Sequence, residues 1–247
     1  MKLKNVGIIL FLTLLLAACG DEKTTVSSEG SKDQSGEENT AAEEKEGTAK
    51  LEISQQTAGA WIDSIDSVWV HSAAIFENTG DTPVEIGETQ MNYKATDGSI
   101  LGTSSMIYAV PQIVNPGETA FIGESTILDG TLTDESFSET TFNFNFSETA
   151  DKPNLMETSG IKGIDGEYGY KVTGIVKNPT TEQQEDIRLA AALFDNTGDL
   201  LGVLQGSVDV GLAAGSEAGF ELSYPELPEE VAAKVATIEV KSYGWTW

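Results

Sequence analysis

Three groups of residues in this sequence have types and spacing that could do chemistry: a lone histidine, a short acidic stretch and an aromatic C-terminus. His71 is the only histidine in 247 residues. A Ser-His-Asp hydrolase needs its histidine to converge with a serine and a carboxylate in one pocket, and no G-x-S-x-G elbow supplies the serine. We expect His71 to be a strand residue at a sheet edge or in a polar contact, and we predict no catalytic residue and no enzymatic activity.

The acidic stretch covers residues 195–199 (Asp-Asn-Thr-Gly-Asp). Calcium requires six to eight oxygen ligands, and this stretch lacks both the spacing and the distal glutamate of an EF-hand loop. A glycine after polar residues at the end of a strand supplies the positive φ of a hairpin turn. We interpret the stretch as such a turn. With one histidine and one cysteine in the chain, we predict no metal site and no cofactor.

The aromatic group ends the chain. In the last predicted strand Ile238 and Val240 share one face, and Glu239 and Lys241 share the other. Three aromatic residues continue the phase of the charged face: Tyr243, Trp245 and Trp247. On a solvent face they would form a platform for a sugar ring or a partner protein. Two alternatives remain open: a bulge at Gly244 turns them into the core, or they cover an interface between two domains.

The elements that would position these residues come in two copies. Three blocks of residues 51–247 recur in the same order about 100 positions later: 74–78 with 174–178, 97–102 with 197–202, and 115–121 with 213–220. Chance matches would not keep this order. We therefore predict two tandem domains of ordinary size, at residues 51–152 and 153–247.

Both copies have the patterns of β-strands. Apolar and polar residues alternate over residues 89–95, 187–193 and 141–146, and period-two alternation is typical of half-buried strands. Turn residues follow each of the first two strands. The only helix we expect is a short one at residues 228–234, where proline suits the first turn. The predicted fold class is all-β, with two immunoglobulin-like β-sandwiches.

The second copy resembles a known family. Residues 190–202 (AAALFDNTGDLLG) and the upstream residues 174–178 (GIVKN) are similar to the central hairpin of FxLYD-type domains, and the resemblance covers roughly residues 165–245. It implies an immunoglobulin-like sandwich of the kind found in bacterial surface lipoproteins. It implies no catalytic residues. The first copy keeps the layout but departs from the motif at residues 92–98.

The N-terminus indicates where the protein lives. Lys2 and Lys4 precede an apolar run of residues 6–16, which is shorter than the ~20 residues a membrane span needs and typical of a secretory signal. The run ends in a sequence that resembles the lipobox of bacterial lipoproteins: Leu16, Ala17, Ala18 and Cys19. The resemblance implies that residues 1–18 are a signal peptide cleaved off before Cys19, and that the Cys19 thiol is lipidated. The alternative is an ordinary signal cut after Ala18, with Cys19 as a bystander.

Composition completes the prediction. The formal net charge is −26, and it becomes −28 when the signal takes away two of the 14 basic residues. Nucleic acid would repel so acidic a chain. Residues 19–50 are polar and acidic with no aromatic residue, which predicts a disordered tether after the lipidated cysteine. We expect a protein lipid-anchored on the outer face of the cell membrane, acting as a non-catalytic binding or adaptor module for an envelope protein or glycan. The alternative is a transport-associated solute-binding lipoprotein.

Overall fold

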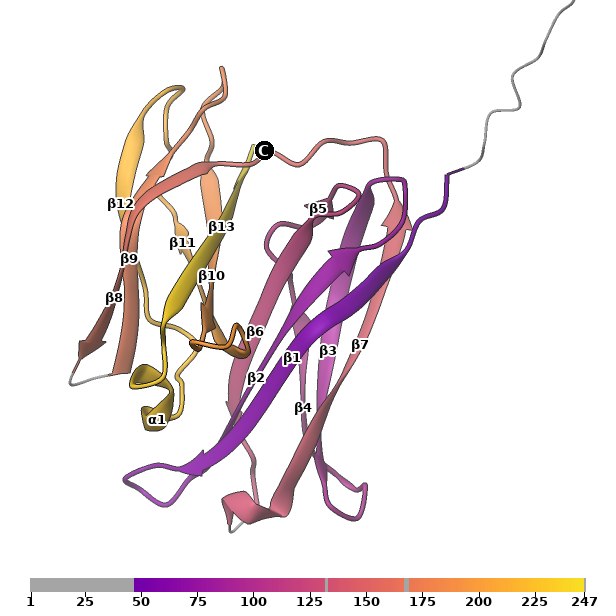
Figure 1. The fold of residues 1–247 in the computed structure, drawn as a ribbon, viewed down its shortest axis with the longest axis vertical. Coiled ribbons are helices and arrows are strands. Elements are labelled where there is room, and N and C mark those ends of the chain that lie inside the picture. The colour runs from indigo at the N-terminus through magenta and orange to yellow at the C-terminus, as the bar shows by residue number, and fades with distance from the viewer. Residues whose placement is uncertain (1–46, 132, 167–168, 247) are drawn as a thin grey trace, which may run out of the picture. The chain divides into compact units, whose positions relative to one another are not determined.

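The computed structural model describes residues 47–131, 133–166 and 169–246, and these lie within one compact unit of the chain. The predicted signal peptide, lipobox and most of the predicted tether fall outside the described residues, as does Trp247. No helix in the described ranges is long and apolar enough to span a membrane. The fold is all-β, as predicted, and consists of two tandem immunoglobulin-like sandwiches of antiparallel sheets (Figure 1).

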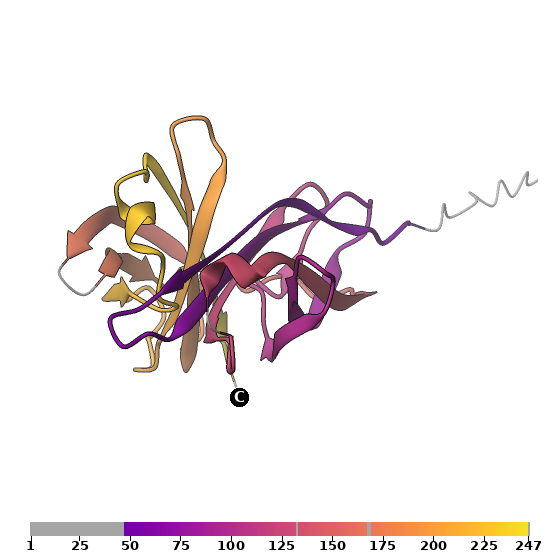
Figure 2. The same ribbon diagram turned by 90° about the horizontal axis from the view of Figure 1, so that it is seen from below.

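The first sandwich contains β1 to β7. One sheet has the order β1-β2-β6, formed by Leu51–Ile62, Val68–Asn78 and Thr119–Ile127. β1 and β2 make a long hairpin, coloured indigo to violet (Figure 1, Figure 2). In the other sheet β3 (Val84–Ala95) pairs with three strands: β4 (Ile100–Ile107), β5 (Ile113–Val114) and β7 (Phe137–Glu148). A single 3-10 turn, Asp134–Ser136, precedes β7.

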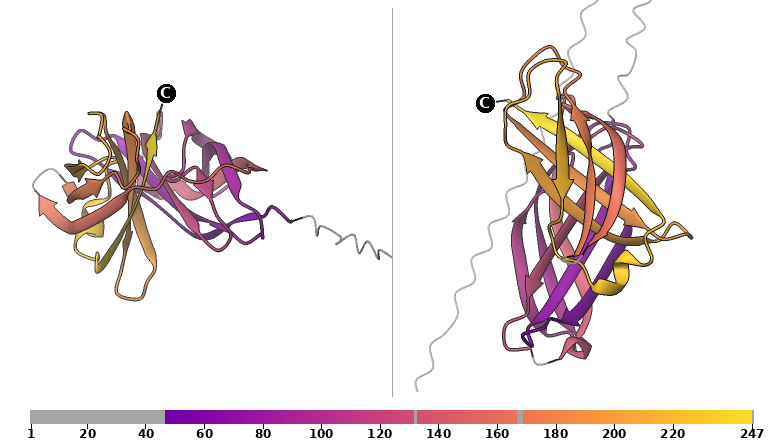
Figure 3. Two further views of the ribbon diagram at one scale, coloured as in Figure 1. Left: turned by 90° about the horizontal axis from the view of Figure 1, so that it is seen from above. Right: turned by 90° about the vertical axis from the view of Figure 1, so that its left-hand side faces the viewer.

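The second sandwich contains β8 to β13. One sheet has the order β12-β9-β8, formed by Glu217–Leu222, Gly169–Lys177 and Glu157–Gly166. The other has the order β11-β10-β13, formed by Leu200–Val208, Asp186–Phe194 and Thr237–Trp245. The predicted short helix is present as α1, Glu229–Ala232, and lies at one end of this sandwich (Figure 3).

The two sandwiches repeat one topology, which accounts for the repeat in the sequence. β1-β2-β6 corresponds to β8-β9-β12, and β4-β3-β7 corresponds to β11-β10-β13. The matched asparagines have the same role in both copies. Asn78 Nδ2 donates to the carbonyls of Thr82 and Val114, and Asn178 Nδ2 donates to those of Glu182 and Leu212, at 2.8–2.9 Å. Each asparagine therefore ties the loop that follows it to a distant strand or loop.

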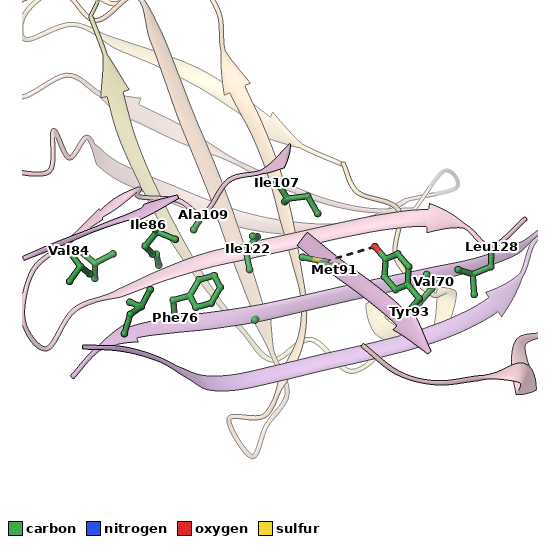
Figure 4. Close-up of a cluster of buried hydrophobic side chains, with 14 of the residues drawn as sticks. Val70, Phe76, Val84, Ile86, Met91, Tyr93, Ile107, Ala109, Ile122 and Leu128 are labelled. Atoms are coloured by element: carbon green, nitrogen blue, oxygen red, sulfur yellow. Dashed lines mark hydrogen bonds between the residues drawn. The ribbon is translucent and has the colours of Figure 1, made fainter. Parts of the chain in front are cut away.

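Each sandwich has its own core, formed by the inward phase of the alternation. In the first, Phe76, Ile86, Met91 and Tyr93 are buried together (Figure 4). The Tyr93 hydroxyl donates to Ser104 Oγ at 2.9 Å, so this buried phenol has a partner. In the second, the predicted inward residues Ile187, Leu189, Ala191 and Leu193 lie in the core.

Two expectations from the sequence need adjustment. The alternation over residues 141–146 predicts one buried face that carries three phenylalanines. Phe142 and Phe144 pack against the core, but Phe146 is 36% exposed because it lies near the end of β7. The predicted tether also ends earlier than residue 50. Lys50 and Thr48 already accept backbone hydrogen bonds from residues 79–81 at 3.0–3.2 Å, so they extend the β1 edge.

Candidate functional site

The two sandwiches meet through a third, smaller hydrophobic cluster. The outer faces of β2 and β6 contribute Ala73, Ile75 and Phe121, and the outer faces of β10 and β11 contribute Ala190, Ala192 and Val203. All six are at most 6% exposed. β2 and β10 are thus buried on both faces, which is typical of strands with continuous apolar runs.

The sequence left open an interface between two domains at the C-terminal aromatic residues, but the strands that form it, β2, β6, β10 and β11, were not predicted, although the sequence carries a signal for two of them. The runs at residues 73–76 (Ala-Ala-Ile-Phe) and 189–193 (Leu-Ala-Ala-Ala-Leu) are apolar in both phases. A strand with one wet face would have polar residues in the outward phase. The small outward residues also let the sheets approach closely: a methyl group added at Gly123 of β6 would lie 2.5 Å from the Val203 carbonyl oxygen of β11.

His71 lies in this interface, 1% exposed, in the polar contact that the sequence suggested. Ser125 Oγ donates to the Glu226 carbonyl at 2.6 Å, so the 2.9 Å contact between Ser125 Oγ and His71 Nδ1 requires Nδ1 to carry the proton. The unprotonated Nε2 then accepts the Val203 backbone N–H at 3.4 Å. Burial lowers the pKa of His71 from 6.5 to about 3. The ring is therefore neutral and links three segments across the interface.

The contact between Ser125 and His71 resembles a nucleophile-base pair only in its distance. A general base must accept the hydroxyl proton, whereas the Ser125 proton goes to a backbone carbonyl and Nδ1 is a donor. Ser125 is 7% exposed, and among the described residues no carboxylate hydrogen-bonds to the imidazole. The arrangement fixes the interface.

Beside the interface residues of both sandwiches line an open cleft of about 560 Å³, within the size range of small-molecule sites. Its lining includes four aromatic side chains: Tyr108, Tyr224, Tyr243 and Trp245. Three of them remain 43–55% exposed: Tyr108, Tyr224 and Trp245. Charged and amide side chains also face the cleft: Glu124, Asp186, Arg188, Gln112 and Gln205. This combination of apolar surface with a few polar groups is typical of binding sites.

Strand register explains the wall supplied by the second sandwich. In β10, Asp186 and Arg188 share the outward face of Ala190 and Ala192, so the surface that is apolar at the interface becomes charged one pair further along. Across β13, Arg188 is opposite Tyr243 and Asp186 is opposite Trp245. Neighbouring cross-strand side chains on one face lie in contact range. The cleft wall is thus the continuation of the interface sheet.

A β-bulge shapes the wall supplied by the first sandwich. Between Ser104 and Ile107 two β4 residues oppose the single residue Gln90 of β3. One of the two is Met106, which has φ 61° and is 67% exposed. Positive φ is uncommon for a residue with a side chain, and bulges often redirect side chains near functional sites. Here the bulge leads into the segment that places Met106 and Tyr108 at the cleft.

The final strand keeps the predicted phase but not the predicted wet face. β13 pairs with β10 without a register shift, so Gly244 introduces no bulge. The charged face turns toward the first sandwich: Lys241 Nζ lies 5.1 Å from the Phe121 ring centroid, and the Tyr243 hydroxyl donates to Gln112 Oε1 at 3.1 Å. Burial raises the pKa of Tyr243 to about 12. Tyr243 therefore covers the domain interface, the second of the two alternatives, while Trp245 lies at the cleft.

Polar contacts organise the charged groups of the cleft. Arg188 donates from Nε and Nη2 to Asp186 Oδ2, at 2.8 Å and 2.6 Å. The second oxygen, Asp186 Oδ1, is buried with no hydrogen-bond partner among the described protein atoms. On the opposite wall Glu124 Oε1 accepts from the Tyr224 hydroxyl and from the Ser125 backbone N–H. Burial, and then the Glu124 carboxylate, raise the pKa of Tyr224, so this phenol stays a donor.

The other residues singled out in the sequence lie elsewhere. Asp195 Oδ1 accepts from the backbone N–H groups of Thr197 and Asp199 at 2.8–3.0 Å, and Gly198 has φ 88°, as in the predicted hairpin turn. Within the described ranges no three acidic, histidine or cysteine side chains converge on one point. The lipobox residues Leu16, Ala17, Ala18 and Cys19 are outside the described residues.

Comparisons with known proteins identify no family for this chain. No family model and no curated protein matches the sequence. Among solved structures, a calcium-binding mutant of Bacteroides uniformis beta-glucuronidase 2 aligns over 73% of this chain and 28% of its own, with 10% identity and a TM-score of 0.20. A beta-glucuronidase from glycoside hydrolase family 2 aligns over 71% of this chain and 20% of its own, with 10% identity and a TM-score of 0.19. The chain thus spans less than a third of either enzyme, and scores this low carry no functional inference.

Proposed function

We propose that this protein is a non-catalytic binding module, lipid-anchored at the outer face of a bacterial membrane, that takes its ligand in the cleft between its two sandwiches. The observation that carries the binding proposal is the cleft of about 560 Å³ with four aromatic residues in its lining. Tyrosine and tryptophan combine a large apolar face with a polar tip, and they are enriched where proteins bind partners.

The membrane anchor rests on the sequence around Cys19. Two lipid chains hold a protein stably in a bilayer, whereas one chain of myristoyl size holds it only marginally. The Cys19→Ala variant should accumulate as unprocessed precursor that does not incorporate labelled fatty acid. Normally processed, membrane-bound Cys19→Ala protein would contradict the anchor without affecting the binding proposal.

Affinity capture tests the binding function. The full chain in detergent is immobilised and exposed to envelope extract, and bound proteins, glycans and small molecules are identified separately. Tyr108→Ala removes an aromatic residue of the cleft that is 45% exposed, and Phe146→Ala, at a position 36% exposed on β7, is the matched control outside it. We expect a specific ligand that Phe146→Ala retains and Tyr108→Ala loses. Equal retention by both variants would place binding elsewhere, and no retention by the unsubstituted protein would refute the function.

The cleft also favours a second candidate, a solute-binding lipoprotein associated with transport. Its lining brings polar groups from both sandwiches together, as a small solute would require. The same capture separates the two candidates by the ligand. A retained envelope protein or polymer supports the adaptor, and a retained small molecule alone supports the solute-binding protein.

A further inference from the structure

The charges of the cleft do not balance. Its lining holds two carboxylates, Glu124 and Asp186, and one guanidinium, Arg188. Arg188 is already paired with Asp186. Glu124 accepts only neutral donors, and no ion pair of the described residues includes it. Glu124 therefore leaves the cleft with a net negative charge, inside a chain whose formal charge is −26.

That charge is hydrogen-bonded to the hydroxyl of an aromatic residue. The Tyr224 hydroxyl donates to Glu124 Oε1, and the tyrosine remains 55% exposed at the cleft. A phenol that donates its hydroxyl proton to a carboxylate gains electron density in its ring. The negative face of an aromatic ring attracts cations. Glu124 and Tyr224 thus present a negative charge and a π-face side by side. Met106 and Tyr108 come from the first sandwich, Tyr224 and Trp245 from the second, and together they line the same space.

We propose that this cleft binds a small organic cation of the alkylammonium class, with Glu124 supplying the charge and Tyr224 the π-face. The proposal rests on the proposed function, because it names the ligand class of the same cleft. Anionic ligands are disfavoured by the unpaired Glu124 and by the field of the whole protein. A neutral saccharide could stack on the same rings, but it would leave the Glu124 charge uncompensated in a partly desolvated site.

Calorimetric titration of the full chain in detergent tests the ligand class. The probe is choline, and its control is the uncharged alcohol in which a tert-butyl group replaces the trimethylammonium group. Both have nearly the same shape and apolar area, so only the charge differs. We expect choline to bind about tenfold more tightly, the size of a partly desolvated cation–π contact. Its affinity should fall as salt is added, because part of the attraction is long-range.

Variants locate the interaction. Glu124→Gln keeps the size and removes the charge, and Tyr224→Leu removes the ring. Glu217→Gln changes the net charge equally at an exposed residue of β12, on the sheet that does not line the cleft. Choline affinity should fall about tenfold in each cleft variant and stay unchanged in Glu217→Gln. Circular dichroism and thermal unfolding of each variant verify that the fold is retained.

The outcomes separate the ligand class from the binding function. Equal affinity for choline and its neutral analogue, or equal loss in Glu124→Gln and Glu217→Gln, would overturn the cation proposal. A panel of neutral saccharides is titrated in parallel. A saccharide bound by the unsubstituted protein and lost in Tyr224→Leu would overturn the cation class and leave the binding function in place. If choline, its analogue and all the saccharides fail to bind, the proposal of a cationic ligand is overturned. The capture experiment alone then decides whether the protein is a binding module.

Discussion

Acidification should weaken this protein through His71, whose pKa falls from 6.5 to about 3 on burial. Below pH 6.5 the His71 imidazole binds a proton in the unfolded chain but stays neutral in the folded protein. The contribution of His71 to the free energy of unfolding is therefore fully present above pH 6.5 and is lost progressively as the pH falls toward 3. A protonated Nε2 would also face the Val203 N–H, two donors with no acceptor between them. This dependence of stability on pH arises from the interface, since Ser125, Val203 and the Glu226 carbonyl hold the His71 imidazole in one neutral tautomer.

The magnitude follows from the same values. A pKa difference of one unit corresponds to about 1.4 kcal/mol. Between about pH 7.5 and about pH 5.5 the unfolded imidazole gains most of one proton and the folded one gains almost none, so the free energy of unfolding should drop by about 1.4 kcal/mol. Carboxylates with lowered pKa, such as Asp63, Asp97 and Asp195, titrate below this window and do not contribute to the change.

Urea unfolding at the two pH values provides the assay, with His71→Gln as the comparison because glutamine does not titrate. General repulsion in this acidic chain eases on acidification, which stabilises both proteins equally. The expected result is a pH-dependent loss of about 1.4 kcal/mol in the unsubstituted protein relative to His71→Gln. Parallel pH dependence in the two proteins would refute the reasoning, whatever their absolute stabilities.

Other substitutions probe the repeat and the interface. Asn178→Ala removes two hydrogen bonds, a buried one to the Leu212 carbonyl and a part-buried one to the Glu182 carbonyl, and should lower the free energy of unfolding by roughly 2–4 kcal/mol; urea unfolding should show a similar loss for Asn78→Ala, and a large difference would contradict the shared role. Gly123→Ala places a methyl group 2.5 Å from the Val203 carbonyl oxygen and should cost about 1–3 kcal/mol. Its control is Gly219→Ala, where the nearest atom is 3.9 Å away, and equal melting temperatures would argue against close sheet contact. Tyr243→Phe breaks the hydrogen bond to Gln112 and should cost about 0.5–1.5 kcal/mol, and an unchanged urea midpoint would show that this contact adds nothing.

Local pattern predicted much of the fold. The alternation in β3 and β10 identified residues that do lie in the two cores, and the turn chemistry at residues 195–199 matches the hydrogen bonds of the hairpin. The match of residues 74–78 with 174–178 aligned two asparagines with identical roles. These features are set by residues close together in the sequence or by the two faces of one strand, so the amino-acid sequence alone is enough to predict them.

The cleft could not be predicted in this way. Its walls come from residues 106–112, Glu124, residues 186–188, residues 205–207, Tyr224 and residues 243–245, which only the docking of two sandwiches brings together. The bulge at Met106 adds a residue that no alternation pattern marks. The strand face on which Tyr243 lies was predicted correctly. The alternation pattern alone, however, does not show whether that face contacts water or a second domain. Only the double-sided apolar runs of β2 and β10 carried that information.

The most direct test of ligand binding between the sandwiches is hydrogen–deuterium exchange of the full chain, with and without the ligand retained from envelope extract. Ligand should slow amide exchange on both walls at once, over residues 106–112 and 122–126 and over residues 186–188 and 243–245. Slower exchange confined to one sandwich, or to the β8-β9-β12 sheet, would contradict binding in the cleft.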